Sequence, residues 1–465
     1  GINNYDSDGF HLSDDFDPTA MEDGDTRENS DSQRLSLFGN LAYQISDDLE
    51  LGVTVEKTTG EYGNPPTTLD DKKDPFYKKP KYDRTEDLDT LSGQVSMGYD
   101  PEGMFDFRGW VFANTSEMKS ARYDDDTYST MTKKNTYTSD DETQIKGATL
   151  QTGVDFDTYG RAVLALSTEA SDYTSDLLNI DKKNQTPTYY FYDHGLDMYS
   201  AALEYNVQLF SRLEILTGYS HHWQTKDTGN DVDKGSYMAG VSFDLTDSTT
   251  MRASYARKIR FPDIKQLYDP KSGNTDLVPE ESKNMEAGIT QRLFKDMVLD
   301  VAVFKNDVEE YIEKNDSTDQ YQNWQSYAFK GFEIYLFKPF LSTGTIGLGY
   351  SFLDTEDESP GAQRDELQYR PEHKYTLEVG YTWDFGLTAH ADILHTADQY
   401  YYSDTFEKGK LKDYTLVNIK LEQRVYKDTV YLYVGVDNLT DENYAESYGL
   451  PRAGRTGYAG LRMTF

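Results

Sequence analysis

Apolar and polar side chains alternate along many short stretches of this chain. In residues 374–383 every second position is apolar or aromatic, and the positions between them are polar or small. The apolar set is Tyr375, Leu377, Val379, Tyr381 and Trp383. Because successive side chains of a β-strand point to opposite faces, this period predicts strands whose two faces meet different environments.

Strands of this kind recur from one end of the chain to the other, about 20 in all. A strand tail is expected within residues 1–12. The others are expected near residues 34–45, 49–58, 87–99, 104–116, 142–157, 160–171, 197–209, 212–225, 235–245, 249–259, 283–294, 297–312, 323–337, 343–354, 372–384, 386–398, 411–425, 428–438 and 455–465.

Short and long connections alternate between these strands. Tight turns are expected at 46–48, 210–211 and 385–386, for example. The long polar connections are expected near 59–86, 117–141, 172–196, 260–282, 355–371, 399–410 and 439–454. A soluble sheet with one buried face shares the pattern of a single strand, but tight turns at one end and long loops at the other are typical of outer-membrane barrels. We therefore predict an all-β fold, a transmembrane antiparallel β-barrel.

Composition narrows the class of protein further. The 465 residues include 38 Tyr and 22 Phe but no Cys, and the net charge is -36. The aromatic content argues against disorder, and no apolar run reaches the roughly 18 residues of a membrane-spanning helix. The acidic balance argues against nucleic acid as a partner, because phosphate would be repelled.

The last segment of the chain carries a spaced set of residues. They are Asn438, Leu439, Asp441, Tyr444, Pro451, Arg452, Gly454, Arg455 and Phe465. This set resembles the C-terminus of TonB-dependent outer-membrane receptors. In that family the terminal Phe belongs to the signal read by the barrel-assembly machinery, and the resemblance gives this role to Phe465.

A second spaced set lies in residues 257–289. It consists of Arg260, Pro262, Leu267, Gly273, Asn274, Leu277, Pro279, Glu280, Ser282, Asn284, Glu286 and Gly288. It resembles an element found in the middle of the barrel of the same receptor family.

The resemblance implies a function. TonB-dependent receptors are active transporters of the Gram-negative outer membrane that take up a scarce chelate, such as a ferric siderophore or cobalamin. The inner-membrane motor acts through the TonB protein on an N-terminal plug domain. Lipopolysaccharide and outer-membrane lipid are then expected partners. No catalytic constellation stands out, so we do not expect an enzyme.

The resemblance also implies a domain organisation. Residues 1–465 match the barrel, whereas the plug, the TonB box and the first two strands of a barrel of about 22 strands are expected to be missing from this sequence. A complete barrel of about 20 strands is the alternative, because even strand numbers are allowed. Two other functions stay open: a plugless porin-like diffusion channel, and a surface receptor whose loops bind a protein.

Two aromatic clusters are candidates for ligand contact. Tyr189, Tyr190 and Tyr192 fall in an expected long loop, and Tyr400, Tyr401 and Tyr402 fall at the outer end of an expected strand. Aromatic rings with a polar tip suit a bulky chelate. Packing within the loops is the alternative for the first cluster, and the aromatic girdle of the barrel is an equal alternative for the second.

Metal binding is weighed on three observations. Asp124, Asp125 and Asp126 form a carboxylate run in an expected loop, as do residues 140–142. Such runs offer oxygen ligands to calcium, although a solvated loop is the commoner outcome. His221 and His222 are adjacent on an expected strand and so should face opposite sides rather than share an ion. Haem is disfavoured, because family members that take up haem carry a His in the loop that corresponds to 263–272, and this loop has none.

Overall fold

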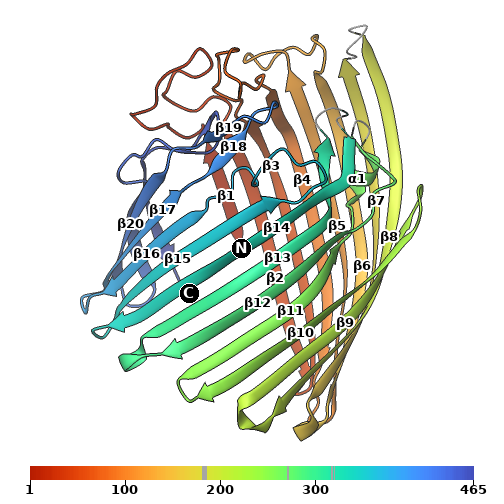
Figure 1. The fold of residues 1–465 in the computed structure, drawn as a ribbon, viewed down its shortest axis with the longest axis vertical. Helices are drawn as coiled ribbons and strands as arrows, with labels where there is room; N and C mark the ends of the chain where they lie inside the picture. The colour runs from red at the N-terminus through yellow and green to blue at the C-terminus, as the bar shows by residue number, and fades with distance from the viewer. Residues whose placement is uncertain (181–185, 270–271, 316–317, 319, 465) are drawn as a thin grey trace.

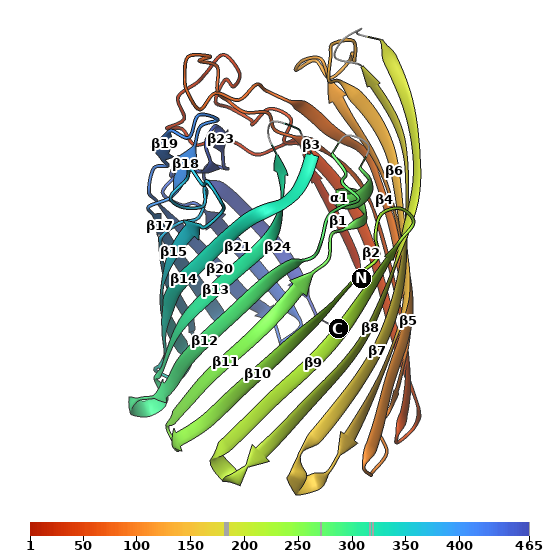
Figure 2. The same ribbon diagram turned by 45° about the vertical axis from the view of Figure 1, so that its right-hand side comes forward.

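The computed structural model describes residues 1–180, 186–269, 272–315, 318 and 320–464. Its main feature is an antiparallel sheet of 20 strands that curls into a barrel (Figures 1 and 2). Each strand pairs with the strands next to it in the chain order. Among the described residues, the first and last strands of the sheet each pair with one neighbour and not with each other. The fold class predicted from the sequence is confirmed.

The strands of the barrel have the following bounds: β1 Ile2–Ser7, β2 Ser32–Ser46, β3 Leu49–Asn64, β4 Tyr82–Tyr99, β5 Phe105–Tyr123, β6 Tyr137–Asp155, β7 Arg161–Ile180, β8 Pro187–Leu209, β9 Leu213–Lys226, β10 Val232–Thr246, β11 Thr249–Arg260, β12 Glu280–Arg292, β13 Val298–Asn315, β14 Gln320–Phe340, β15 Gly344–Asp357, β16 His373–Thr382, β17 Leu387–Ala397, β20 Tyr414–Tyr426, β21 Val430–Asp437 and β24 Thr456–Met463. Two small sheets lie in the loops, one of β18 (Tyr400–Tyr402) with β19 (Lys408–Lys410) and one of β22 (Ala445–Ser447) with β23 (Leu450–Pro451).

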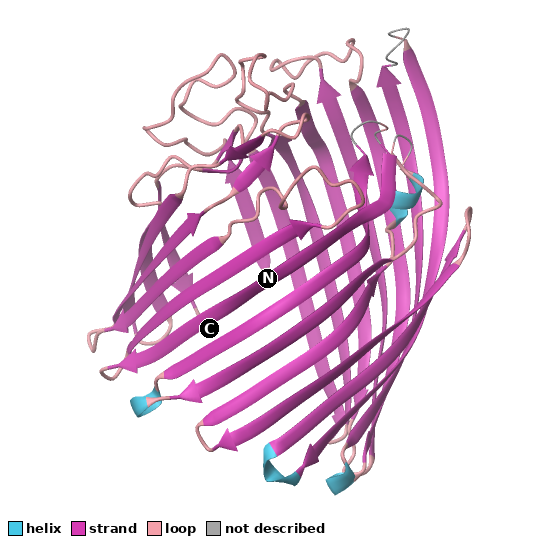
Figure 3. Cartoon of the chain, viewed as in Figure 1, coloured by secondary structure: helices cyan, strands magenta, loops and turns pink. Residues whose placement is uncertain are grey.

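The two ends of the barrel differ, as the alternation of connections predicts. Tight turns close one end, and three of them contain the short 3-10 helices η1 (Asp157–Tyr159), η2 (Phe210–Arg212) and η3 (Phe294–Asp296) (Figure 3). Phe210 and Phe294 are 87% and 83% exposed there. Exposed rings at one end of the strands are typical of the interfacial girdle of a membrane barrel. The long loops and the one α-helix among the described residues, α1 (Ile264–Tyr268), lie at the other end.

The strand register separates the two faces of the sheet. Leu348, Leu377, Ile393 and Val417 pair in one row across four strands, so they share a face. The next row of the other parity contains Glu378, Asp392 and Asn418, and the Asn418 amide donates to the Asp392 carboxylate at 2.7 Å. An apolar outer face over a polar lumen is the arrangement that a lipid-embedded barrel requires.

Strands β4 to β8 rise further than the sequence predicts. Residues 172–196 were expected to form a long loop, but most of them belong to β7 and β8. The prediction of a loop at Tyr189, Tyr190 and Tyr192 is therefore wrong, as is the prediction of a loop at residues 140–142, which lie in β6. In these upper parts polar residues occupy both faces of the strands, so the alternation that identifies a strand disappears.

The loops pack on one another beside the mouth of the barrel. Arg27 and Glu22 form an ion pair whose side chains are 1% and 0% exposed, and Arg27 also donates to the Pro66 carbonyl oxygen. Ser13 in the loop after β1 donates to the Asp441 carbonyl oxygen in the loop before β24 at 2.6 Å. These contacts join loops that emerge from β1, β3 and β21. Separately, no helix in the described part of the chain is long and apolar enough to cross a membrane.

Candidate ligand-binding site at the mouth of the barrel

The upper part of β7 and β8 carries an aromatic surface on its lumenal face. Ser175 pairs with Tyr192 and Tyr173 with His194, so these four side chains share one face of the sheet. Tyr190 and Tyr192 stack with ring centroids 6.2 Å apart. Tyr189 has the other parity, and its hydroxyl donates to Asp176 on the outer face. The predicted aromatic cluster is therefore divided: Tyr190 and Tyr192 face inward, and Tyr189 faces outward.

The helix α1 identifies which face is lumenal. It belongs to the connection between β11 and β12, yet it packs against β7 and β8, past the intervening strands (Figure 2). A segment that spans these strands from the loop end lies inside the curl of the sheet. Its side chains and those of the wall form a closed apolar cluster of Tyr173, Leu196, Ile264, Leu267, Tyr268, Leu277 and Ile312. The ring of Tyr268 stacks on His194 at 4.3 Å.

The residues of the mid-chain motif fold this connection inward. Arg260 and Glu280 form a two-pronged ion pair at its base, and Glu280 also accepts from the Ile312 backbone N–H at 2.8 Å. Asp263 caps α1 through a reciprocal bond pattern with Gln266. The side chain of Asp263 satisfies a backbone N–H that would otherwise lack a partner at the start of the helix.

The second half of the same connection is held by polar contacts. Lys226 on β9 donates to the carbonyl oxygens of Thr275 and Leu277 at 3.3 and 3.2 Å. Asn274 donates to the Tyr321 carbonyl oxygen at 2.8 Å. At Gly273 a Cβ atom would lie 2.6 Å from the backbone nitrogen of Asp269, so only glycine fits there. Several residues of the mid-chain motif, on which the family resemblance is based, therefore build this part of the mouth.

One carboxylate organises the charge beside the aromatic surface. Asp141 accepts from the Ser175 hydroxyl at 2.6 Å and from the Tyr173 hydroxyl at 3.3 Å. Lys265 of α1 lies 3.4 Å from Asp141, and its ammonium sits 5.4 Å above the Tyr173 ring. The wall of the mouth therefore offers aromatic faces together with hydroxyl, carboxylate and ammonium groups, which suits a bulky polar ligand.

The second predicted cluster, Tyr400 to Tyr402, lies elsewhere. It forms β18, away from the barrel sheet. The ring of Tyr401 stacks on Tyr448 at 4.4 Å and meets Phe76 edge-on at 4.6 Å. Burial raises the pKa of the Tyr401 phenol, which stays neutral at physiological pH. Tyr401 and Tyr402 are buried where the loops pack together, and Tyr400 is half-buried beneath the ammonium of Lys408.

The carboxylate run at Asp124, Asp125 and Asp126 lies in a loop, as predicted. Asp124 accepts hydrogen bonds from Thr130, Thr132 and Lys133 of the same loop. Burial acts to raise the pKa of Asp124, but these bonds outweigh it and lower that pKa to about 2. The oxygens of Asp124 therefore already accept hydrogen bonds within the loop. Calcium at this position stays a prediction.

Two further predictions concern single residues. His221 binds Asp233 at 3.0 Å, whereas His222 binds the Ser220 hydroxyl at 2.9 Å, and the two rings take opposite parities of β9, as predicted. Phe465, the predicted assembly signal, lies outside the described residues.

Sequence reasoning missed three of the four residues that complete the mouth, and it identified the fourth, Asp141, only as part of a carboxylate run in an expected loop. His194, Tyr268, Asp141 and Lys265 come from three separate segments and meet only through the register and the inward fold of the connection. The connection 263–272 has no His of its own, but the structure places His194 against its helix. The mid-chain motif was the one available signal of the inward fold, because it resembles an element of a known receptor family and so indicates that the connection is more than a free loop.

A curled sheet with a polar lumen, tight turns at one end and a loop folded into its mouth at the other defines a large transmembrane β-barrel. The profile of the family described as TonB dependent receptor-like, beta-barrel, matches residues 54–439. The chain belongs to this family.

A curated relative is similar in sequence to part of the chain, and solved structures share its fold. The Vitamin B12 transporter BtuB of Vibrio cholerae serotype O1 is 27% identical over 222 residues, which are 46% of this chain and 34% of that relative. This alignment thus spans about a third of the relative's length. The copper transporter OprC shares the fold with a TM-score of 0.80 at 16% identity, covering 100% of this chain and 76% of that one. The ferric yersiniabactin uptake receptor FyuA from Yersinia pestis gives 0.74 at 14% identity, covering 100% and 74%.

Proposed function

We propose that the protein is a TonB-dependent active transporter of a Gram-negative outer membrane. The observation that carries this proposal is the family match over residues 54–439. Residues 1–465 supply the barrel wall and the outer loops, and a plug domain of the kind found in the family supplies the gate on which TonB acts. The apolar outer face lies in outer-membrane lipid and the loop end meets lipopolysaccharide.

The cargo in this proposal is a scarce chelate, such as a ferric siderophore or cobalamin. It first contacts the lumenal wall at Tyr190, Tyr192 and His194, where stacked rings stand beside the Asp141 and Lys265 pair. Aromatic rings give a large contact area at a small entropy cost, which suits a rigid chelate. The vitamin B12, yersiniabactin and copper named for the relatives make cobalamin, ferric siderophores and copper the first panel to test.

The experiment has two arms. Cells that lack the gene and carry the full-length protein on a plasmid are grown with each member of the panel as the sole source of the nutrient. Growth that needs the plasmid identifies the cargo, and growth on none of the panel argues against these classes.

The second arm uses the two faces of β8. Replacement of the inward Tyr192→Ala removes one aromatic anchor and should weaken cargo binding about tenfold or more. Tyr189→Ala removes an equal ring from the outer face of the same strand and should leave binding unchanged. Equal effects of the two changes would place the ligand away from the lumenal wall.

A further inference from the structure

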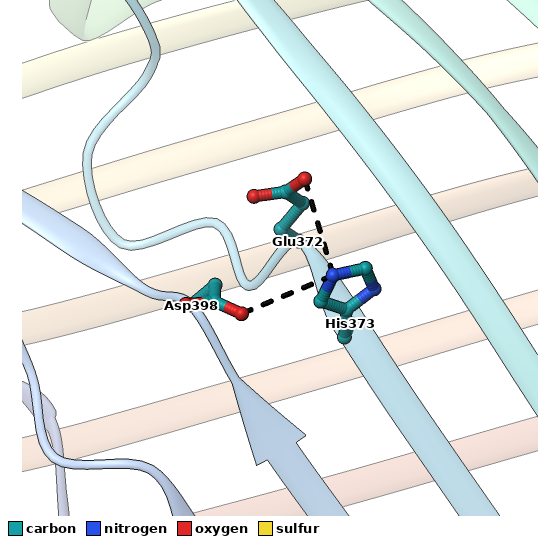
Figure 4. Close-up of side chains that lie close together, drawn as sticks. All are labelled: Glu372, His373 and Asp398. Atoms are coloured by element: carbon teal, nitrogen blue, oxygen red, sulfur yellow. Dashed lines mark ion pairs between the residues drawn. The ribbon is translucent and has the colours of Figure 1, made fainter.

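A histidine and two carboxylates converge at the rim of the barrel, apart from the lumenal wall (Figure 4). Glu372 comes directly before β16, His373 is its first residue, and Asp398 comes directly after β17. The Nε2 atom of His373 lies 4.0 Å from a Glu372 oxygen and 3.9 Å from Asp398 Oδ2. Within the described part of the chain, these three residues form the only group of at least three His, Cys, Asp or Glu side chains whose donor atoms all lie within 4.8 Å of one another.

Backbone hydrogen bonds bring the three residues side by side, and ring stacking orients His373. The backbone N–H of Glu372 donates to the Asp398 carbonyl oxygen at 3.0 Å, which ties the start of β16 to the end of β17. The N–H of Asp398 donates to Asp413 at 3.0 Å. The His373 ring stacks on Tyr350, with centroids 6.1 Å apart. The three residues are therefore neighbours because the backbone fixes the start of β16 beside the end of β17.

The other ring nitrogen of His373 is already occupied. Its Nδ1 lies 3.0 Å from the Tyr350 hydroxyl. When Nδ1–H donates to that hydroxyl, the lone pair of Nε2 faces the two carboxylates. A partner on one ring nitrogen that leaves the other free is the usual outer-shell arrangement of a metal-binding histidine.

The distances leave space for a cation between the donor atoms. Separations of 3.9 and 4.0 Å are too long for a hydrogen bond. With zinc bonds of about 2.0–2.2 Å, the donor atoms of a tetrahedral site lie about 3.3–3.6 Å apart, so a small movement of the Glu372 and Asp398 side chains would let one ion bind all three donors. His221 provides the contrast within the same chain: its Nδ1 binds the Tyr219 hydroxyl at 3.1 Å, but its Nε2 binds the single carboxylate of Asp233 directly at 3.0 Å.

The charge around the group fits a divalent ion. Asp398 Oδ1 binds the Lys410 ammonium at 2.7 Å, which leaves Oδ2 to face His373. Glu372 and Asp398 thus place two carboxylates beside the imidazole of His373. An imidazole nitrogen among the donors selects zinc and its neighbours over calcium or magnesium, which prefer oxygen ligands alone.

We propose that Glu372, His373 and Asp398 form a binding site for a transition-metal dication such as Zn²⁺. The ion would tie β16 to the segment after β17, which leads directly to Tyr401 and the packed loops. The site is separate from the cargo surface on β7 and β8, so it stands or falls independently of the proposed transport function.

The test is isothermal titration of the full-length, metal-stripped protein in detergent with ZnCl₂, and with CaCl₂ for comparison. We expect one Zn²⁺ per chain at this site and no calcium binding there, so any calcium signal should be the same in the wild type and in His373→Ala. His373→Ala should abolish the zinc signal, whereas His221→Ala, which removes a histidine with a tyrosine and one carboxylate around it, should leave it unchanged. Far-UV circular dichroism verifies that each variant is folded.

A gentler variant keeps the test informative if His373→Ala does not fold. Tyr350→Phe keeps the stacked ring but removes the hydroxyl that orients His373, and loss of such a partner weakens metal affinity about 10- to 100-fold. Zinc binding that is equal in the wild type, His373→Ala and Tyr350→Phe would overturn the proposal, as would a wild type that binds no zinc at micromolar concentration.

Discussion

Truncation of Leu267 tests whether the apolar cluster holds the α1 connection against the wall of the mouth. Leu267 is 1% exposed and packs in the cluster with Tyr173, Leu196 and Leu277. Leu267→Ala at such a site costs about 2–5 kcal/mol. Because the cluster lies at the open mouth, where the cavity can partly collapse, we expect the lower part of that range, about 2–3 kcal/mol. The lost free energy destabilises the docking of the connection, because the barrel strands keep the backbone hydrogen bonds that join them to their neighbours.

Hydrogen exchange measured by mass spectrometry reports this docking directly. The amides of Asp269 and Asn274 donate within the connection, to the carbonyl oxygens of Lys265 and Gln266. When reclosing is faster than exchange, a loss of about 2–3 kcal/mol speeds their exchange about 30- to 150-fold, at tenfold for each 1.4 kcal/mol. Leu348→Ala on the outer face is the control and should leave these amides unchanged. A change of less than about threefold in Leu267→Ala would refute the claim that this cluster docks the connection.

Three further outcomes follow from the same contacts. Gly273→Ala should loosen the α1 connection, because the added Cβ would lie 2.6 Å from a backbone atom, whereas the Cβ of Gly240→Ala would have its nearest contact at 3.9 Å and should change nothing. Limited proteolysis compares the two variants. Equal cleavage would contradict the packing argument. Tyr401→Ala removes contacts with three aromatic neighbours, each worth about 0.5–1.5 kcal/mol. Trypsin should therefore cleave the packed loops faster in this variant. Unchanged cleavage would mean that other contacts hold the loops. The folded pKa of Asp124 lies below its ordinary 3.8, so its stabilisation of the loop after β5 is present above about pH 4 and is lost as the pH falls toward 2. Proteolysis by pepsin across this window should show the loss in the wild type but not in Asp124→Asn.

The barrel was predictable where the two faces of a strand meet different media. Along β16, lipid on one side and the lumen on the other keep the alternation at Tyr375, Leu377 and Val379 clear enough to set the strand and its parity. The tight turns were predictable for the same reason, since the alternation stops there. The upper halves of β7 and β8 were not predictable by this means, because both faces carry polar residues there, including the buried Ser171 and Ser175 beside Tyr173 on the inner face.

The site was predictable only in part. Aromatic residues at 189–192 were identified, but their division between two faces follows from the register of β8, which required knowing that this segment is a strand. The contact of His194 with Tyr268 and that of Asp141 with Lys265 join segments distant in the chain. Such contacts depend on how a loop folds across several strands, and no local pattern in one sequence encodes that path. The same holds for Glu372, His373 and Asp398, which the ends of two strands bring together.

Uptake of a labelled cargo tests the central claim most directly. Cells that carry the full-length protein are compared with and without a functional TonB protein. The external cargo concentration is kept far below the concentration that saturates uptake. Active transport predicts accumulation against the gradient that disappears when TonB is absent, while binding to the cell surface remains. Uptake that is equal in the two strains and never exceeds the outside concentration would contradict the account and indicate a diffusion channel.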